Sequence, residues 1–295
     1  MTALETVAEP GREAPSVAFL QWALPRLGLK WTGFRRVRRQ VWRRLSRRLA
    51  ELHLGDPECY RAYLESHTEE WTILDSFCRI PTSRFLRDYE VFDLLGAEVL
   101  PALAEAASRR GDSQVRAWSA GCASGEEPYS LVLLWRFQLQ PRFPDVSIEV
   151  IATDIDEQLL ERAREARYRR SSLREVPRAW LEAAFISDGE WFTLRPEFRS
   201  QVEFRRADVR AELPHCAFDM ILCRNLVCTY FDEPLSHGTL ARMLSILRPG
   251  GALVIGHKEH LPAGLTGVET WAAPLGIFRR VASAEHGMAS ALEAA

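Results

Sequence analysis

The sequence predicts an α/β protein: a mainly parallel sheet with helices on both faces, preceded by a small all-helical amino-terminal domain. Three observations support this fold class. From about residue 107 onward, short apolar runs alternate with helical patterns, which is typical of a parallel sheet. Before that point the patterns are helical only. The chain of 295 residues, 47% of them hydrophobic, is long enough to bury a sizeable core.

The amino-terminal region contains four helical patterns separated by turn residues. Asp56 is a suitable N-cap for the third pattern, because Pro57 follows it at the first helical position. The second pattern holds eight arginines, and its apolar residues recur every four positions, which predicts an amphipathic basic helix. The apolar stripe consists of Val37, Val41, Leu45 and Leu49. The four patterns cover residues 16–28, 34–48, 56–66 and 68–77.

The rest of the chain supplies the strands and helices of the sheet. Apolar runs that predict strands cover residues 115–120, 146–154, 202–208, 218–225 and 251–258. Helical patterns lie between several of them, at 126–140, at 155–168 and from about residue 232 to the "LRPGG" stop. Because ligands bind at the carboxyl ends of the strands in such sheets, the loops that follow these strands are the candidate site.

Composition excludes several other classes of protein. No apolar run approaches the length of about 18 residues that a membrane span needs, and the first residues do not resemble a secretory signal. We therefore expect a cytoplasmic protein without membrane insertion. The six cysteines are scattered, with no CxxC pair and no histidine at finger spacing, which favours reduced thiols and no metal site.

The most informative stretch is "SAGCASGEEPYS", which has a glycine turn between a predicted strand and a predicted helix. Its glycines, Gly121 and Gly125, follow a GxxxG spacing and not the GxGxxG of dinucleotide sites. The two glutamates after Gly125 would repel a pyrophosphate. A cationic cofactor with a ribose and no phosphate, such as S-adenosyl-L-methionine, fits better, with Asp154 accepting from the ribose hydroxyls. A plain strand-to-helix turn without a ligand is the alternative.

Several motifs together resemble the CheR-type methyltransferases, which esterify glutamates on bacterial chemoreceptors. "WSAGCASGEEPYSL" is similar to the cofactor loop of that family, and "ATDID" to its second-strand signature. "FDMILCRN" with "TYFD" resembles the fourth-strand signature, and "LRPGGALVIGHKE" the end of the sheet. Upstream, "TSRFLRD" is similar to the threonine–phenylalanine–arginine segment of the family. In this order, the motifs span residues 82–259.

The resemblance implies a Rossmann-like class I methyltransferase sheet and gives roles to matching positions. Arg87 and Tyr230 correspond to the active-site arginine and tyrosine of the family; taken singly, they could instead be a surface ion-pair residue and a core aromatic. The chain has one residue more than the family between Asn225 and the tyrosine. The positions assigned to the pocket of the cofactor, whose product is S-adenosyl-L-homocysteine, are Ser83, Arg87, Gly121, Gly125, Glu127, Asp154, Asp208, Val209, Arg224 and Asn225.

The resemblance also divides the chain into parts. It implies a helical domain at 1–78, a connecting segment and helix at 79–106, a methyltransferase domain at 107–285 with a small insert at about 186–201, and a loose tail at 286–295. In some family members the insert docks a receptor peptide by strand addition, and a hairpin without a partner is the alternative.

The expected reaction is methyl transfer to glutamyl carboxylates of a chemoreceptor-like protein. A glutamate with a pKa near ~4.3 is ionised at neutral pH, so no general base is needed. The arginine-rich helix would meet an acidic helical partner such as a chemoreceptor cytoplasmic region. A pI of about 6.4 argues against nucleic acid. Two alternatives stay open: a related enzyme with another protein or small-molecule acceptor, and a non-catalytic adaptor that binds through the arginine-rich helix.

Overall fold

The computed structural model describes residues 13–281, and the tail predicted at 286–295 lies outside them. The chain forms two compact units. One consists of residues up to Ile80 together with Thr229–Asp232, and the other of Pro81–Cys228 with the residues from Glu233 onward. Within the described part, no helix is both long and apolar enough to cross a bilayer.

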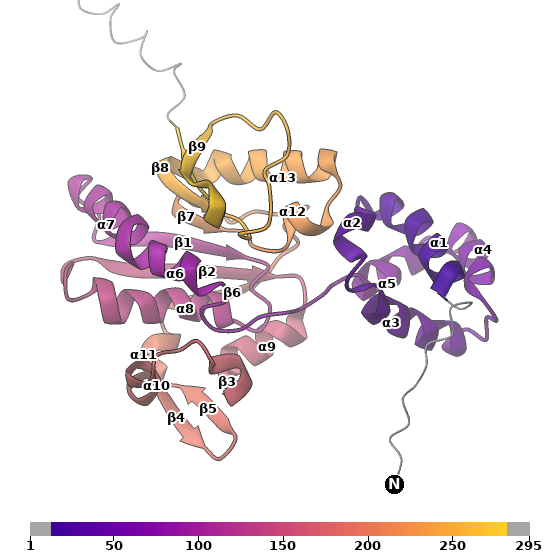
Figure 1. Ribbon diagram of the computed structural model, residues 1–295, viewed down its shortest axis with the longest axis horizontal. Coiled ribbons are helices and arrows are strands. Elements are labelled where there is room, and N and C mark those ends of the chain that lie inside the picture. Colours follow the sequence, from indigo (N-terminus) through magenta and orange to yellow (C-terminus); the bar gives the residue numbers. More distant parts are fainter. Residues whose placement is uncertain (1–12, 282–295) are drawn as a thin grey trace, which may run out of the picture. The chain divides into compact units, whose positions relative to one another are not determined.

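The first unit is helical, as its patterns predict (Figure 1). Its helices are α1 (Glu13–Ala23), α2 (Trp31–Phe34), α3 (Arg38–Glu51), α4 (Pro57–Ser66) and α5 (Glu70–Phe77). The predicted cap of α4 is confirmed, because the Asp56 carboxylate accepts a hydrogen bond from the Cys59 N–H at 2.8 Å. The single arginine-rich helix expected from residue 34 is wrong at its start. A turn at residues 35–37 separates α2 from α3, so Val37 precedes the helix.

Buried residues hold the helical unit together. Val41, Leu45 and Leu49 of the predicted stripe are buried on one face of α3. Arg48, on the same helix, donates from Nε and Nη2 to the buried carboxylate of Glu70, at 2.9 and 2.8 Å. The hydroxyl of Tyr60 donates to the same carboxylate at 2.7 Å. The unit therefore has an apolar core and a buried carboxylate, Glu70, that accepts three hydrogen bonds from a partly exposed arginine and a buried tyrosine.

The second unit is built on a seven-stranded sheet in the order β6-β2-β1-β7-β8-β10-β9. Its strands are β1 (Gln114–Ala120), β2 (Ser147–Asp154), β6 (Val202–Arg206), β7 (Phe218–Leu222), β8 (Leu247–Val254), β9 (Val268–Ala272) and β10 (Ile277–Arg280). Neighbouring strands from β6 to β8 pair in parallel, whereas β10 is antiparallel to β8 and β9. The chain order reverses direction at β1, which is where ligands bind in such sheets.

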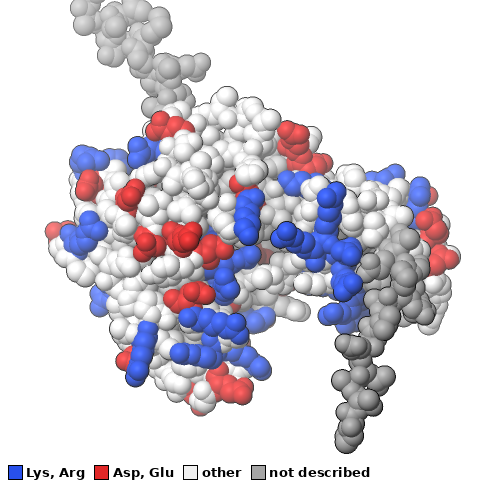
Figure 2. All heavy atoms as spheres, viewed as in Figure 1, with Lys and Arg blue, Asp and Glu red and all other residues white. Residues whose placement is uncertain are grey.

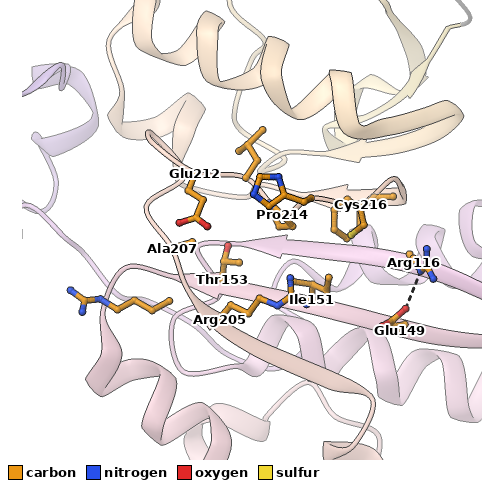
Figure 3. A pocket seen from close by; sticks show the side chains of 13 residues that line it. Arg116, Glu149, Ile151, Thr153, Arg205, Ala207, Glu212, Pro214 and Cys216 are labelled. Atoms are coloured by element: carbon orange, nitrogen blue, oxygen red, sulfur yellow. Dashed lines mark hydrogen bonds and ion pairs between the residues drawn. The ribbon is translucent and has the colours of Figure 1, made fainter.

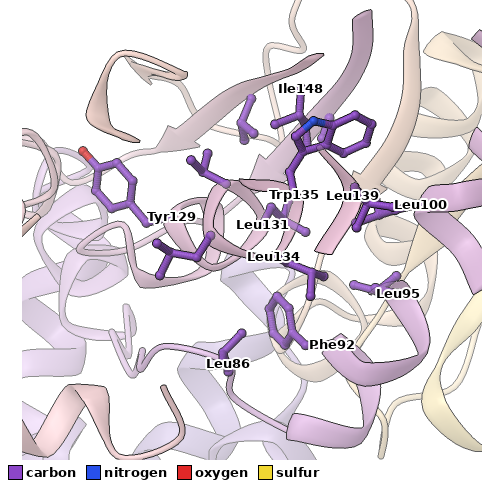
Figure 4. Close-up of a cluster of buried hydrophobic side chains, with 14 of the residues drawn as sticks. Leu86, Phe92, Leu95, Leu100, Tyr129, Leu131, Leu134, Trp135, Leu139 and Ile148 are labelled. Carbon is purple, nitrogen blue, oxygen red and sulfur yellow. The ribbon is translucent and has the colours of Figure 1, made fainter. Parts of the chain in front are cut away.

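Helices cover both faces of this sheet, which confirms the predicted fold class (Figure 1). They are α6 (Tyr89–Leu94) and α7 (Leu100–Arg109), joined by a π-helical turn (Leu95–Val99), α8 (Glu126–Leu134) with a π-helical extension (Trp135–Leu139), α9 (Glu157–Glu165) and α13 (Glu233–Ile246). The short helix α12 (Val227–Tyr230) is divided between the two units. Figure 4 shows the core in which Leu131, Leu134 and Trp135 meet Phe92 and Ile148.

Successive side chains along each strand point to opposite faces of the main sheet. Met220 and Val254 belong to the core under α7 and α8, while their buried neighbours Ile221 and Leu253 point to the opposite side. On that opposite side, the connection between β6 and β7, residues 207–217, consists of turns and bends and not of a helix. A cavity of about 370 Å³ lies there, lined by thirteen residues that include Ile151 (Figure 3). None of the predicted cofactor residues lines it.

A small antiparallel sheet lies between α9 and β6. Its order is β3-β5-β4, formed by β3 (Arg167–Arg169), β4 (Phe185–Asp188) and β5 (Trp191–Leu194). A short 3-10 helix (Arg170–Leu173) and α10 (Arg178–Ala184) connect β3 to β4, and α11 (Pro196–Arg199) leads on to β6. The small sheet thus begins at residue 167, about twenty residues before the predicted insert.

Candidate active site

The glycine turn after β1 packs so closely that side chains do not fit. The Gly121 N–H donates to the Thr153 carbonyl at 2.8 Å, which joins the ends of β1 and β2. Gly121 and Gly125 both have positive φ, 75° and 89°. A Cβ would lie 2.6 Å from Leu226 Cδ2 at the first glycine and 2.9 Å from Ala163 Cβ at the second. The positive φ angles and the close neighbours together favour glycine at both positions, and of the two Gly121 is exposed while Gly125 is buried.

Asp154, at the carboxyl end of β2, has the geometry expected of a ribose acceptor. Its Oδ2 accepts from the Ala123 N–H at 2.9 Å, and its Oδ1 from the Asp156 N–H at 3.0 Å. Each oxygen keeps a lone pair for a further donor. Burial raises the pKa of Asp154 above its usual value. The carboxylate is thus fixed in direction by two backbone donors, which suits the two adjacent hydroxyls of a ribose.

The two glutamates of the turn differ in their surroundings. Glu127 accepts from the Ser119 hydroxyl at 2.8 Å and pairs with the Arg224 guanidinium at 3.2 Å. Glu126 is buried and is hydrogen-bonded by serine hydroxyls on the other side of the helix start. Only Glu127 therefore lies with the other predicted site residues.

Arg224 connects the glycine turn after β1 to the segment before α6. Its side chain is buried and pairs with Asp88 at 2.6 Å as well as with Glu127. The same guanidinium donates to the Arg87 carbonyl at 2.8 Å and lies over the ring of Phe92, 5.4 Å from its centroid. The segment that carries Arg87 is thus joined by one planar cation to the glycine turn after β1, residues 121–127, which is called the cofactor turn below.

Backbone strain is concentrated at the same place. Six non-glycine residues of the described part have positive φ, and four of them lie in the site segments: Leu86, Asp88, Ala123 and Asn225. Such conformations cost on the order of 1–3 kcal/mol each, and they persist where the surroundings fix them. At Asn225 the surroundings include Glu259, whose carboxylate accepts from the Asn225 N–H at 2.9 Å. The strained turns therefore indicate a functional site.

Of the other predicted residues, Asp208 and Val209 follow a strand, whereas Ser83 and Arg87 lie in the segment before α6. Asp208 lies just after β6 and accepts from the backbone N–H and side chain of Arg210, and Val209 beside it is buried. Ser83 is half-buried in the segment before α6. The Arg87 side chain is half-buried too, and its Nη1 donates to the Thr82 carbonyl at 2.8 Å.

Tyr230 belongs to the helical unit. Its ring packs on Phe34, with 4.9 Å between centroids, and its carbonyl accepts from the Lys30 N–H at 2.8 Å. The structure thus brings Arg87, Glu127 and Arg224 together within the second unit, whereas Tyr230 lies in the first unit. The catalytic roles of Arg87 and Tyr230 stay predictions.

Three residues of the candidate site are not among those predicted from the sequence. Asp88, Ser119 and Glu259 all bind predicted residues directly. Asp88 and Ser119 had a usable signal, since each lies next to or within a motif that was already recognised. Glu259 closes the last motif, but nothing in its spacing points to Asn225.

Comparison with known proteins identifies the family of the chain. Residues 81–273 match the family "CheR methyltransferase, SAM binding domain". The chemotaxis protein methyltransferase of Listeria innocua is 35% identical over 192 residues, covering 64% of this chain and 70% of the relative. That of Klebsiella aerogenes is 35% identical over 233 residues, 76% of each chain. That of Escherichia coli K12 is 33% identical over 233 residues, 76% of this chain and 77% of the relative.

The matched region contains every predicted cofactor residue, and the family it describes binds S-adenosylmethionine. The predicted cofactor, the predicted methyltransferase activity and the resemblance drawn from the motifs are therefore confirmed. The chain belongs to the CheR methyltransferase family.

Proposed function

We propose that this chain transfers a methyl group from S-adenosylmethionine to glutamyl carboxylates of a chemoreceptor cytoplasmic region, in the cytoplasm. Methyl esters and S-adenosylhomocysteine would be the products. The names of its relatives, chemotaxis protein methyltransferases, support the choice of substrate. The observation that carries the proposal is the Arg224 cluster, in which the backbone of Arg87 and the carboxylate of Glu127 share one buried guanidinium.

The carboxylates and glycines of the second unit would hold the cofactor. Asp154 is oriented for the ribose hydroxyls, and Gly121 and Gly125 let the backbone approach closely. Glu127 would face the cationic end of the cofactor, with Ser119 and Arg224 fixing its direction. When bound, S-adenosylmethionine supplies an electrophilic methyl group on a sulfonium. These residues would hold and orient the cofactor, and none of them needs to transfer a proton.

The acceptor needs orientation more than activation. A glutamate is ionised at neutral pH, so one carboxylate oxygen forms the new bond to the methyl carbon while the bond from that carbon to sulfur breaks. Arg87 would steer the carboxylate, because an arginine fork binds a carboxylate through two parallel hydrogen bonds. Tyr230, by resemblance to the family, would donate a hydrogen bond to the same group.

The helical unit carries a surface that suits an acidic partner. Figure 2 shows blue side chains gathered over α2 and α3. The exposed arginines of this basic surface are Arg35, Arg36, Arg39, Arg43 and Arg47. The remaining arginines of α3 are only partly exposed: Arg38 donates to the Arg35 carbonyl, Arg44 to the Phe77 carbonyl at the end of α5, and Arg48 pairs with Glu70. The exposed set would raise the encounter rate with the glutamate-rich helices of a receptor.

Transfer of a labelled methyl group tests the proposal. The protein is incubated with methyl-labelled S-adenosylmethionine and a cell extract of the source organism, and the labelled products are treated with mild alkali. We expect label on a protein and its release as methanol, since an ester hydrolyses under these conditions and an N-methyl group does not. Asp154→Ala should reduce the transfer when S-adenosylmethionine is limiting, because its affinity for the cofactor is lower. Label that resists alkali would assign a different acceptor.

Calorimetric titration with S-adenosylhomocysteine separates the enzyme from the adaptor alternative. We expect binding heat from the wild-type protein. An adaptor that acts only through the arginine-rich helix would give none, and would still bind its acidic partner. Reversing charge at Arg43 and Arg47 should weaken transfer to the protein acceptor without changing the affinity for S-adenosylhomocysteine.

A further inference from the structure

The small sheet contacts the cofactor turn through polar groups as well as apolar ones. Its first strand, β3, and the 3-10 helix after it contribute Tyr168 and Ser172. Both residues donate side-chain hydrogen bonds to the segment 124–126, which begins α8. Neither contact follows from the architecture of the main sheet, because the small sheet pairs only with itself.

Glu126 is the centre of the first contact. Glu126 is only 5% exposed. One oxygen of its carboxylate accepts from Ser124 Oγ at 2.8 Å and the other from Ser172 Oγ at 3.1 Å. A buried carboxylate that is paired with no cation depends on such donors. Its position at the start of α8 also places it near the positive end of the helix dipole. Removing Ser172 Oγ would leave one oxygen of Glu126 with no hydroxyl donor from the small sheet.

Tyr168 makes the second contact. Its hydroxyl donates to the Ser124 carbonyl at 2.8 Å, directly before Gly125. A Cβ on Gly125 would lie 3.2 Å from this hydroxyl, so the tyrosine closes the space beside the turn. The ring is buried and packs edge-on against Phe85, with 4.8 Å between centroids. The turn is thus held in place from the side that faces away from Glu127.

The same 3-10 helix reaches the segment that carries Arg87. The Phe85 N–H donates to the Ser172 carbonyl at 3.0 Å, and the Leu86 N–H donates to Ser130 Oγ of α8 at 2.9 Å. Leu86 has a positive φ of 50°, so this segment is strained and needs external contacts to keep its shape. Ser172 therefore contacts the cofactor turn with its hydroxyl and the acceptor segment with its carbonyl.

We propose that Ser172 and Tyr168 are positioning residues of the methyl-donor site, which makes the small sheet a support of the cofactor turn. This inference rests on the proposed placement of the cofactor at residues 121–127. Ser172 and Tyr168 touch no reacting group in this account. They act through Glu126 and Ser124, which set the course of the backbone between Gly121 and Glu127.

Three variants and one control test the inference in the full chain. Tyr168→Phe removes only the hydroxyl and keeps the buried ring, and Ser172→Ala removes one donor to Glu126. Ser172→Thr keeps a hydroxyl. The matched control is Ser187→Ala, an exposed serine in β4 of the same small sheet. Calorimetry gives the affinity for S-adenosylhomocysteine, steady-state kinetics gives KM and kcat, and circular dichroism gives the unfolding midpoint.

We expect Tyr168→Phe and Ser172→Ala to weaken binding of S-adenosylhomocysteine by about threefold to tenfold each, which is the range for loss of one buried hydrogen bond. KM for S-adenosylmethionine should rise more than kcat falls. Ser172→Thr should restore most of the affinity, and Ser187→Ala should match the wild type. These two comparisons separate positioning from a general loss of stability.

Two results would overturn the inference. If the wild type binds S-adenosylhomocysteine and both variants bind it equally well, the small sheet does not position the turn, and the proposed function is unaffected. If the wild type itself gives no binding heat, the placement of the cofactor is wrong and both proposals fall. Should Ser172→Ala unfold, Tyr168→Phe and Ser172→Thr still decide between these outcomes.

Discussion

Replacing Arg224 with methionine tests whether one buried guanidinium holds the site together. The Arg224 side chain is 2% exposed, and those of its partners Asp88 and Glu127 are 20% and 15% exposed. Breaking a buried pair by removing one partner costs about 3–5 kcal/mol, because the other charge is left without compensation. Two carboxylates lose their partner here, yet both keep some contact with water. We therefore expect Arg224→Met to lower the free energy of unfolding by about 4 kcal/mol.

Urea unfolding followed by circular dichroism measures this loss, which is a large part of the roughly 5–15 kcal/mol that stabilises a typical domain. The control is Arg164→Met. Arg164 pairs with Glu157 at a similar distance, 2.7 Å, but the two side chains are 44% and 42% exposed. An exposed pair contributes about 1 kcal/mol or less, so this variant should be nearly as stable as the wild type.

A second substitution shows whether unpaired charge is the cause. Asp88→Asn in the Arg224→Met background removes one of the two stranded carboxylates, so it should recover part of the lost stability. The reasoning fails if Arg224→Met is as stable as Arg164→Met, since the buried pairs would then contribute nothing net. It also fails if Asp88→Asn destabilises the double variant further.

Three further outcomes follow from individual contacts. Asp154→Ala should weaken binding of S-adenosylhomocysteine by about 1–3 kcal/mol, measured by calorimetry, because two ribose hydroxyls lose their acceptor; an unchanged affinity would reject the ribose role. Arg87→Ala should lower kcat for methyl transfer while leaving cofactor affinity nearly unchanged, and the reverse pattern would make it a cofactor residue only. Glu70→Gln should destabilise the helical unit at neutral pH, and urea unfolding should show that the difference from wild type fades in acid. Hydrogen bonds from Arg48 lower the pKa of Glu70 from its ordinary 4.5. A carboxyl with a lowered pKa contributes stability above its unfolded value and loses it as the pH falls through the folded value. A difference that stays unchanged as the pH falls far below the ordinary value of 4.5 would contradict this account.

The arrangement of the main sheet was predictable because its strands are long enough to show a pattern. In the run 146–154, Ile148, Val150 and Ala152 are buried on the face that α8 and α9 cover, whereas Glu149, Ile151 and Thr153 point to the other face and line the cavity there. Once the strands are placed, the parallel topology brings Gly121, Asp154, Asp208 and Asn225 to one edge. The small sheet gave a weaker signal, because β3 has three residues and β4 and β5 have four each.

Side-chain partners far apart in the chain were not predictable from spacing. Arg224 lies 136 residues from Asp88 and 97 from Glu127. No local pattern encodes such a pair, because it depends on how two loops meet after the sheet has formed. The resemblance to a family assigns Arg224 to the cofactor pocket, and the contacts that the structure shows for it are to Asp88, Glu127 and the Arg87 carbonyl.

The two adjacent glutamates of the cofactor turn have separate tasks, and helix geometry explains why. Consecutive residues of an α-helix point about 100° apart, so the side chains of Glu126 and Glu127 leave the helix in different directions. Glu127 points toward Ser119 and Arg224, on the side of the predicted cofactor residues. Glu126 points toward Ser124 and Ser172, where its charge is held by hydroxyls and the start of the helix. In the proposed site, Glu127 is therefore the carboxylate that faces the cationic methyl donor, and Glu126 supports the shape of the turn that presents it.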